Sequence, residues 1–217
     1  MKYKNILFFC LMVVLLGCST RGPVTPNDSA TSHAVVCDRA GLVVTVDPSL
    51  EFVGRIQKTM SAKHEPTVRT YTTQVFIRAD SNRRVQALAV VEEAGIEDGI
   101  WLDETSNRYD LHRQGGRFGS WEYRGRVNIF CGNDYYVEQF LKENGYVMDE
   151  CLLYSVRSGL LNFGRNEKLS VQYAEPVDDD EVGNFFGDEF RLKGKDKFVR
   201  EFYERSQALL GIVASSD

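Results

Sequence analysis

Alternating apolar and polar residues predict strands along much of this chain. Tyr71–Ile77 shows the two-residue period that places every second side chain on one face of a sheet. Asp80–Asn82 then predicts a turn, and the run Val85–Val91 would return beside the first strand as a hairpin. Similar runs predict further strands over Leu42–Val46, Leu50–Lys58, Cys151–Val156, Leu160–Phe163 and Leu169–Tyr173.

A second hairpin is predicted from two segments rich in aromatic residues and arginine. Tyr109–Arg113 and Phe118–Phe130 would be its strands, and Gly115-Gly116 would supply the turn between them. In the longer strand, alternation predicts one face in the core and the other in water. The core-facing residues would be Trp121, Tyr123, Val127 and Ile129, and the water-facing residues Glu122, Arg124 and Arg126.

Two segments have apolar residues at helical spacing instead. The first follows Asn133 or Asp134, either of which can cap a helix, and Asn144-Gly145 would end it. The second runs from about Asp196 to Ile212, with apolar residues along one side and charged residues along the other. The apolar face of the first helix would consist of Tyr136, Val137, Phe140 and Leu141.

Runs of strands interrupted by only two helices are typical of an α+β fold, here a mainly antiparallel sheet with both helices packed on one face. The chain has 217 residues, of which 43% are hydrophobic and 12% aromatic, so it carries enough apolar side chain for a packed core. The sequence shows no internal repeat. We therefore predict a single globular domain over residues 34–217.

The N-terminal segment has a different character. Lys2 and Lys4 precede an unbroken apolar run, Ile6–Leu16. As a helix this run would be about 16 Å long, whereas the hydrocarbon core of a bilayer is about 30 Å thick. A charged start followed by a short apolar run predicts a secretory signal rather than a transmembrane helix.

The run ends in Leu15-Leu16-Gly17-Cys18, which resembles the lipobox of bacterial lipoproteins. The resemblance covers residues 1–20 only. It implies that residues 1–17 are a signal peptide cleaved by signal peptidase II, and that the thiol of Cys18 is diacylated. In this family, a serine after the lipidated cysteine usually permits export to the outer membrane, and Ser19 fits that pattern. The alternative is an ordinary secretory signal that happens to contain a cysteine.

Residues 18–33 are small and polar and include Pro and Gly, which predicts a flexible tether between the lipid and the domain. Fully extended, this tether would reach about 50 Å. The predicted location is therefore the cell envelope, with the protein anchored through its N-terminal lipid, at the outer membrane and facing the periplasm.

The charge balance argues against nucleic acid as a partner. The whole chain has a formal net charge of −5, and removal of residues 1–17, which include two lysines and no acid, leaves −7. General nucleic-acid binding needs positive charge to neutralise phosphates. We therefore expect no nucleic-acid partner.

The predicted domain contains three cysteines, Cys37, Cys131 and Cys151. Beyond the inner membrane they would meet an oxidising compartment, so one disulfide and one remaining thiol are expected. Three pairings satisfy this expectation. Cys131 and Cys151 flank the first predicted helix, but that position alone does not bring them together.

Motifs for catalysis or metal binding are absent from the sequence. His33, His64 and His112 lack the short or helical spacing of metal ligands. The acidic run Asp178–Glu181 lacks the alternate spacing of a calcium loop and predicts a solvated loop. Just after it, the two phenylalanines of Gly183–Gly187 would either fold back on the core or form an exposed anchor. We predict no catalytic residue, no metal site and no cofactor.

One basic stretch stands out in this acidic chain. Residues 108–126 carry five arginines against Asp110 and Glu122, with four aromatic residues between them. Arginine beside aromatic residues is enriched at binding interfaces, because guanidinium groups both stack and form paired hydrogen bonds. Arg117, Arg124 and Arg126 are therefore the candidate partner-binding residues. The simpler interpretation is a strand with an ordinary water-facing side.

The predicted anchor, the tether and the missing catalytic motifs together favour a non-enzymatic envelope lipoprotein that binds another envelope component. Two alternatives remain open. The domain would be a carrier whose sheet wraps a lipid or other apolar ligand, or a periplasmic hydrolase whose catalytic residues are scattered along the chain.

Overall fold

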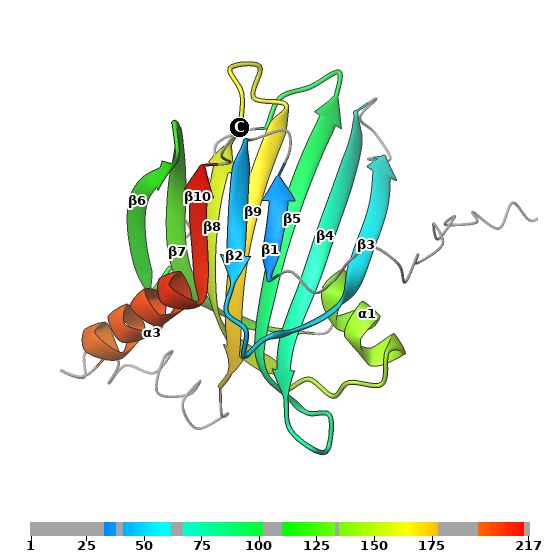
Figure 1. The fold of residues 1–217 in the computed structure, drawn as a ribbon, viewed down its shortest axis with the longest axis vertical. Coiled ribbons are helices and arrows are strands. Elements are labelled where there is room, and N and C mark those ends of the chain that lie inside the picture. The colour runs from blue at the N-terminus through cyan, green and yellow to red at the C-terminus, as the bar shows by residue number, and fades with distance from the viewer. Residues whose placement is uncertain are drawn as a thin grey trace, which may run out of the picture.

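The computed structural model describes residues 33–37, 41–61, 67–101, 110–132, 135–177 and 195–214. They form two antiparallel sheets and two helices (Figure 1). The seven-stranded sheet has the order β3-β4-β5-β9-β8-β7-β6, and the three-stranded sheet the order β1-β2-β10. The predicted α+β class with a mainly antiparallel sheet is confirmed.

The strands of the large sheet are β3 (Glu51–Ser61), β4 (Val68–Ala79), β5 (Val85–Glu97), β6 (His112–Phe118), β7 (Trp121–Cys131), β8 (Cys151–Leu160) and β9 (Glu167–Pro176). Those of the small sheet are β1 (Ala34–Cys37), β2 (Leu42–Val46) and β10 (Leu210–Ala214), and the helices are α1 (Tyr136–Glu143) and α3 (Lys195–Leu209). The predicted strand at Leu42–Val46 and the β4–β5 hairpin are confirmed.

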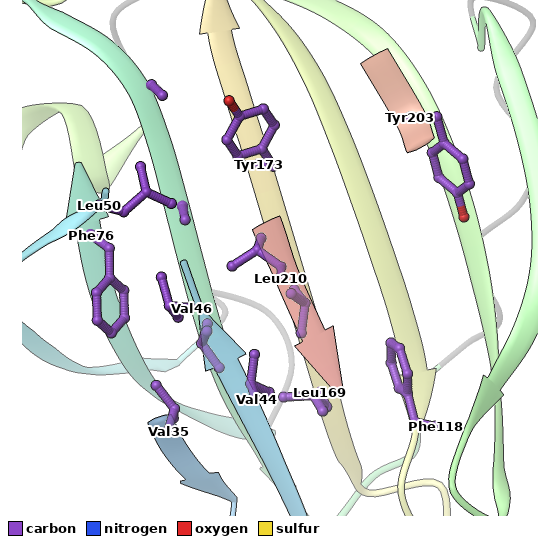
Figure 2. Close-up of a cluster of buried hydrophobic side chains, with 14 of the residues drawn as sticks. Val35, Val44, Val46, Leu50, Phe76, Phe118, Leu169, Tyr173, Tyr203 and Leu210 are labelled. Atoms are coloured by element: carbon purple, nitrogen blue, oxygen red, sulfur yellow. The ribbon is translucent and has the colours of Figure 1, made fainter. Parts of the chain in front are cut away.

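The larger hydrophobic cluster lies between the two sheets (Figure 2). One face of β5 contributes Ala89 and Val91, and the facing side of β2 contributes Val44 and Val46, all of them buried. α3 closes the same cluster with Phe202, which is fully buried. The small sheet and α3 therefore share one face of the large sheet.

α1 packs on the opposite face of the large sheet. Leu88 and Val90 alternate with the residues of β5 that point to the first cluster, and they pack with Val137 and Leu141 of α1 in a second cluster. The prediction that both helices pack on one face is therefore wrong. An apolar stripe shows that a helix buries one side, but a sheet that is apolar on both faces offers two places for it.

The chain beyond α3 is a strand rather than a continued helix. Leu210–Ala214 pairs with β2 in the antiparallel register that sets Leu210 opposite Val46. Buried Arg157 of β8 donates a hydrogen bond from Nη2 to the carbonyl oxygen of Leu210 at 2.6 Å, which ties the start of β10 to the large sheet. The predicted helix end at Ile212 is thus wrong, and the β-branched pair Ile212-Val213 suits a strand better.

The turn of the β6–β7 hairpin also differs from the prediction. It lies at Gly119-Ser120, where Gly119 has a φ of +56°. Gly115 and Gly116 lie inside β6, and a Cβ on Gly116 would come within 2.4 Å of the Tyr123 ring. Close approach of a ring, rather than a turn, accounts for the glycine at position 116.

Two further boundaries differ. β8 continues only to Leu160, so the predicted strand Leu160–Phe163 is mostly a turn. α1 has Tyr135 at its N-cap without a side-chain capping bond, while Gly145 has the left-handed φ of +79° expected at its end. Asn133 and Asp134 lie outside the described residues, as do Tyr109, the predicted signal peptide and all of the predicted tether except His33.

Within the described residues, the structure contains no helix long and apolar enough to cross a membrane.

Candidate functional site

A buried polar network lies where α1 meets the large sheet. Thr73 of β4 and Glu92 of β5 are direct cross-strand partners. Glu92 is 8% exposed, and a carboxylate at that depth needs hydrogen-bond donors. Tyr136 at the start of α1 supplies one, since its hydroxyl donates to Glu92 Oε2. Thr73 Oγ1 lies 2.8 Å from the Tyr136 hydroxyl and 3.5 Å from Glu92 Oε2.

The neighbouring strands extend the network. Tyr135 donates its hydroxyl hydrogen to Gln172 Oε1 of β9 at 2.7 Å, and the hydroxyl of Tyr154 on β8 donates to the same oxygen. Gln172 Nε2 then donates to Ser170 Oγ at 3.3 Å. Hydrogen bonds thus join α1 to β4 and β5, and its N-cap residue to β9, which is joined in turn to β8.

The electrostatics of the network suit hydrogen bonding better than proton transfer. Burial raises the pKa of the hydroxyls of Tyr135, Tyr136 and Tyr154 above the usual tyrosine range. The Glu92 carboxylate acts in the same direction because it disfavours a neighbouring phenolate. The three hydroxyls therefore stay protonated near neutral pH and act as donors.

The network holds α1 in place. Its donors point to acceptors within the same cluster, so the arrangement is internally satisfied, as a buried network must be to stabilise a fold. Within the described parts of the chain, no group of three histidine, cysteine, aspartate or glutamate residues is arranged to hold a metal ion. We therefore interpret this cluster as structural, and expect a binding site to lie on the surface instead.

We expect Tyr136→Phe to lower the free energy of unfolding by about 1–3 kcal/mol, because it leaves the buried Glu92 carboxylate without its closest donor. Urea unfolding followed by circular dichroism measures this change. The matched control is Tyr146→Phe, because the hydroxyl of Tyr146 makes no hydrogen bond with any described part of the chain. Equal effects of the two substitutions would contradict the role given to Glu92.

The predicted partner-binding arginines lie together at one edge of the large sheet. Arg117 is on edge strand β6, and Arg124 and Arg126 are on its neighbour β7. Cross-strand pairs set Glu122 opposite Arg117, and Arg113 opposite Arg126. Because directly paired residues point to the same face, all three arginines share the α1 side of the sheet.

The predicted alternation in β7 is confirmed. Trp121, Tyr123, Val127 and Ile129 pack on the cluster between the sheets. Arg117 and Arg124 are exposed and Arg126 is half-buried. The structure thus brings the three arginines together on adjacent strands, and Arg124 and Arg126 already have interactions within the protein.

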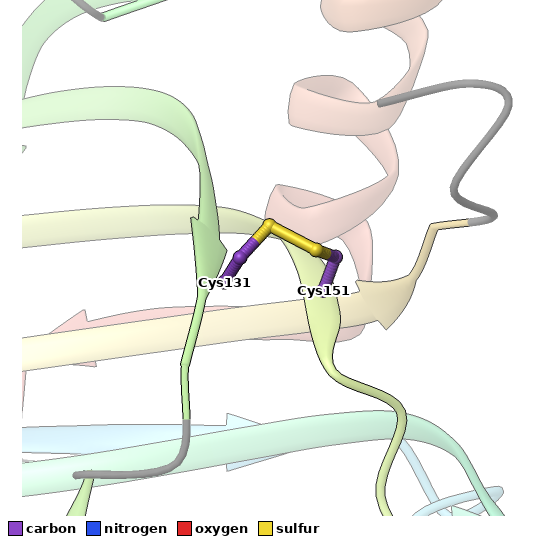
Figure 3. Close-up of a disulfide and its surroundings, with 2 residues drawn as sticks. All are labelled: Cys131 and Cys151. Carbon is purple, nitrogen blue, oxygen red and sulfur yellow. A yellow bond between two sulfur atoms is a disulfide. The ribbon is translucent and has the colours of Figure 1, made fainter. Parts of the chain in front are cut away.

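The disulfide joins Cys131 and Cys151, which are opposite each other at the ends of β7 and β8 (Figure 3). The bond encloses α1, and its two cysteines are separated by 20 positions in the sequence. Cys37 is the remaining thiol and is buried in the first cluster. Only the formation of a strand pair between β7 and β8 distinguishes this pairing from the other two.

Three predicted features lie outside the described residues, namely the acidic run Asp178–Glu181, the loop Gly183–Gly187 and Cys18. In contrast, the structure reveals one surface feature that the sequence did not, the fully exposed Phe163 in the turn between β8 and β9. The only signal in the sequence was the neighbouring Asn162 and Gly164, which favour a turn.

Comparisons of this chain with protein-family models, with characterised proteins and with solved structures find no match. Any function must therefore be argued from the residues themselves.

Proposed function

We propose that this protein is a lipid-anchored envelope lipoprotein that acts as a binding module without enzymatic chemistry. Cys18 would carry the lipid at the outer membrane, and residues 18–33 would hold the domain on a tether. Support for the anchor comes from the sequence alone, namely the lysines, the apolar run and the lipobox-like Leu15–Cys18.

The observation that supports a binding role is that the interior of the domain is filled by its own side chains. Buried side chains from both sheets and from α3 fill the space between the sheets, and the polar network under α1 is satisfied internally. Neither region resembles an open ligand cavity or a catalytic centre. On the surface, the most distinctive charged group is the edge formed by β6 and β7, which carries Arg117, Arg124 and Arg126.

These arginines would bind an acidic partner surface in the envelope. Guanidinium groups on two adjacent strands present several donors in one plane, which matches carboxylates on another protein. The carrier alternative is less favoured because the apolar residues between the sheets already pack on one another. For the hydrolase alternative, the described residues contain no group of histidine, cysteine, aspartate or glutamate side chains that could hold a catalytic metal ion.

We expect the triple substitution Arg117→Ala/Arg124→Ala/Arg126→Ala to leave the thermal midpoint within a few degrees of wild type but to abolish co-purification of the partner. The reason is that Arg117 and Arg124 are exposed and contribute little to stability, the half-buried Arg126 accounts for a decrease of a few degrees, and interface arginines contribute much to binding. Native mass spectrometry of the protein purified in mild detergent measures retained partners, retained small ligands and the mass of any acyl groups.

A matched triple substitution on the opposite edge strand serves as the control. Arg55, Gln57 and Thr59 are exposed residues of β3, so their replacement by alanine should keep the partner bound. If the arginine variant retains every co-purified protein, the arginine surface is wrong. A retained small apolar ligand would favour the carrier, and the absence of acyl groups on Cys18 would reject the anchor.

A further inference from the structure

The turn between β8 and β9 presents a phenylalanine to solvent at one end of the molecule. The Phe163 side chain is 98% exposed, the highest value among the exposed large hydrophobic residues of the described structure. The turn is the yellow loop that projects at the top of Figure 1, beyond the ends of the neighbouring strands. Transfer of a phenylalanine side chain out of water lowers the free energy, so burial of this exposed ring against a partner would contribute to binding.

Hydrogen bonds on both sides fix the turn that carries this phenylalanine. The side-chain oxygen of Asn162 accepts from the backbone N–H of Asn166 at 3.1 Å, and the Arg165 N–H donates to the Asn162 carbonyl at 3.1 Å. Ile96 of β5 and Trp101, which follows that strand, add two more bonds, from the Ile96 N–H to the Asn166 carbonyl at 2.9 Å and from the Trp101 N–H to the Arg165 carbonyl at 2.7 Å. The exposed ring is therefore carried by a turn whose backbone is fixed by hydrogen bonds.

Two apolar side chains accompany this ring, one in contact with it and one in the segment that bonds to the turn. Trp121, the first residue of β7, meets Phe163 edge to face, with ring centroids 5.8 Å apart. Ile100, which precedes the Trp101 that bonds to the turn, is 55% exposed. Tryptophan and phenylalanine together at the end of a surface element are the residues enriched where proteins meet the bilayer interface.

We propose that the Asn162–Asn166 turn is a membrane-contact element, in which Phe163, backed by Trp121, enters the interfacial region of a phospholipid bilayer. This inference rests on the proposed lipid anchor, which would keep the domain beside a membrane. A contact that is weak in free solution becomes significant when a tether supplies a high local concentration of the surface.

The length of the chain before β1 is compatible with this contact. Residues 18–33 separate Cys18 from the start of β1, and fully extended they span about 50 Å. The ten residues of β9, which run away from the turn, cover about 33 Å. The start of β1 lies lower in the molecule than the turn, as Figure 1 shows, and the tether is long enough for the turn to reach the membrane that holds the lipid.

The chemistry of the turn favours a bilayer over a pocket in a partner protein. Backbone groups that approach the hydrocarbon core need hydrogen-bond partners, and the carbonyls of Asn162, Arg165 and Asn166 and the N–H groups of Arg165 and Asn166 have them within the protein. A single projecting ring is also a small anchor, suited to a fluid surface that needs no complementary shape. A protein interface of ordinary size would need a far larger contact area.

The acylated chain, reconstituted in phosphatidylethanolamine/phosphatidylglycerol vesicles with brominated acyl chains, tests the proposal. Since the protein has two tryptophans, Trp101→Phe leaves Trp121 as the only indole. We expect bromine in the lipid to quench Trp121 fluorescence, and Phe163→Ser to remove most of that quenching. Phe163→Leu should preserve it, because leucine is also apolar.

The matched control is Phe130→Ser, which removes another partly exposed phenylalanine, 43% exposed, at the far end of β7. It should leave the quenching unchanged. Unquenched Trp121 in the acylated protein, or equal quenching in Phe163→Ser, would overturn the membrane contact alone. Intact mass is measured on the same sample, and a chain without acyl groups on Cys18 would overturn both this inference and the proposed anchor. Loss of a bound protein in Phe163→Ser without any lipid quenching would assign the turn to a protein partner and also reject the proposal.

Discussion

The double substitution Cys131→Ser/Cys151→Ser is expected to lower the free energy of unfolding by about 3 kcal/mol, as predicted for a crosslink that closes a loop of this length. The crosslink joins β7 directly to β8 and encloses α1, so the unfolded chain gains the freedom of the whole enclosed segment when the bond is lost. For a domain of this size, the corresponding decrease in thermal midpoint is about 6–12 °C.

Thermal unfolding with and without a reductant measures this effect. The reductant should lower the midpoint of the wild-type protein to that of the double variant and should leave the variant itself unchanged. Cys37 does not contribute to the difference, because its thiol is present in both proteins and is buried. A wild-type midpoint that does not respond to full reduction would contradict the stabilising role of the bond.

Phe202→Ala is expected to cost about 3–5 kcal/mol, the range for removal of a buried aromatic ring that leaves a cavity. Phe202 is fully buried on α3 and packs on Tyr173 of β9, with ring centroids 5.7 Å apart. Its loss would weaken the attachment of α3 to the large sheet and, through the chain that follows, the attachment of β10.

The control is Phe198→Ala, one helical turn earlier on the same helix. Phe198 is 39% exposed, so less of its area returns to water upon unfolding and we expect a cost of about 1 kcal/mol or less. Urea unfolding measures both variants. Equal costs at the two positions would mean that α3 does not pack on the large sheet through Phe202.

Local patterns in the sequence were sufficient for several elements. The β4–β5 hairpin follows from alternation on either side of a turn, and α1 from helical spacing that ends at Gly145. The inward and outward residues of β7 follow from the same period of two. In each case, the information lies within about a dozen neighbouring residues, which is the range over which a periodic pattern acts.

Features that depend on distant parts of the chain could not be predicted in this way. Leu210–Ala214 continues the apolar pattern of α3, and only the presence of β2 beside it makes it a strand. Cys131 and Cys151 come together because β7 pairs with β8. The contact between Glu92 and Tyr136 joins residues 44 positions apart, and the sequence around either residue does not predict that the other is its partner.

The site was only partly predictable for the same reason. The arginines of β6 and β7 attracted attention as a basic stretch, and alternation correctly assigned their side of the strand. Phe163 escaped notice because an apolar residue after a strand is usually part of that strand. Its exposure depends on where β8 ends. The hydrogen bonds from Ile96 and Trp101 that fix this turn come from residues distant in sequence.

The small sheet has a consequence for the order in which the protein assembles. Its central strand, β2, precedes every strand of the large sheet in the sequence, but one of its two neighbours, β10, follows all of those strands and α3. A ribosome delivers the chain from its N-terminus and therefore presents β1 and β2 long before their partner β10 emerges. Such pairing between distant segments is slow, because the intervening chain must be ordered first. We expect the small sheet to complete its structure last, so that a chain stalled before β10 would remain open to proteases at β2.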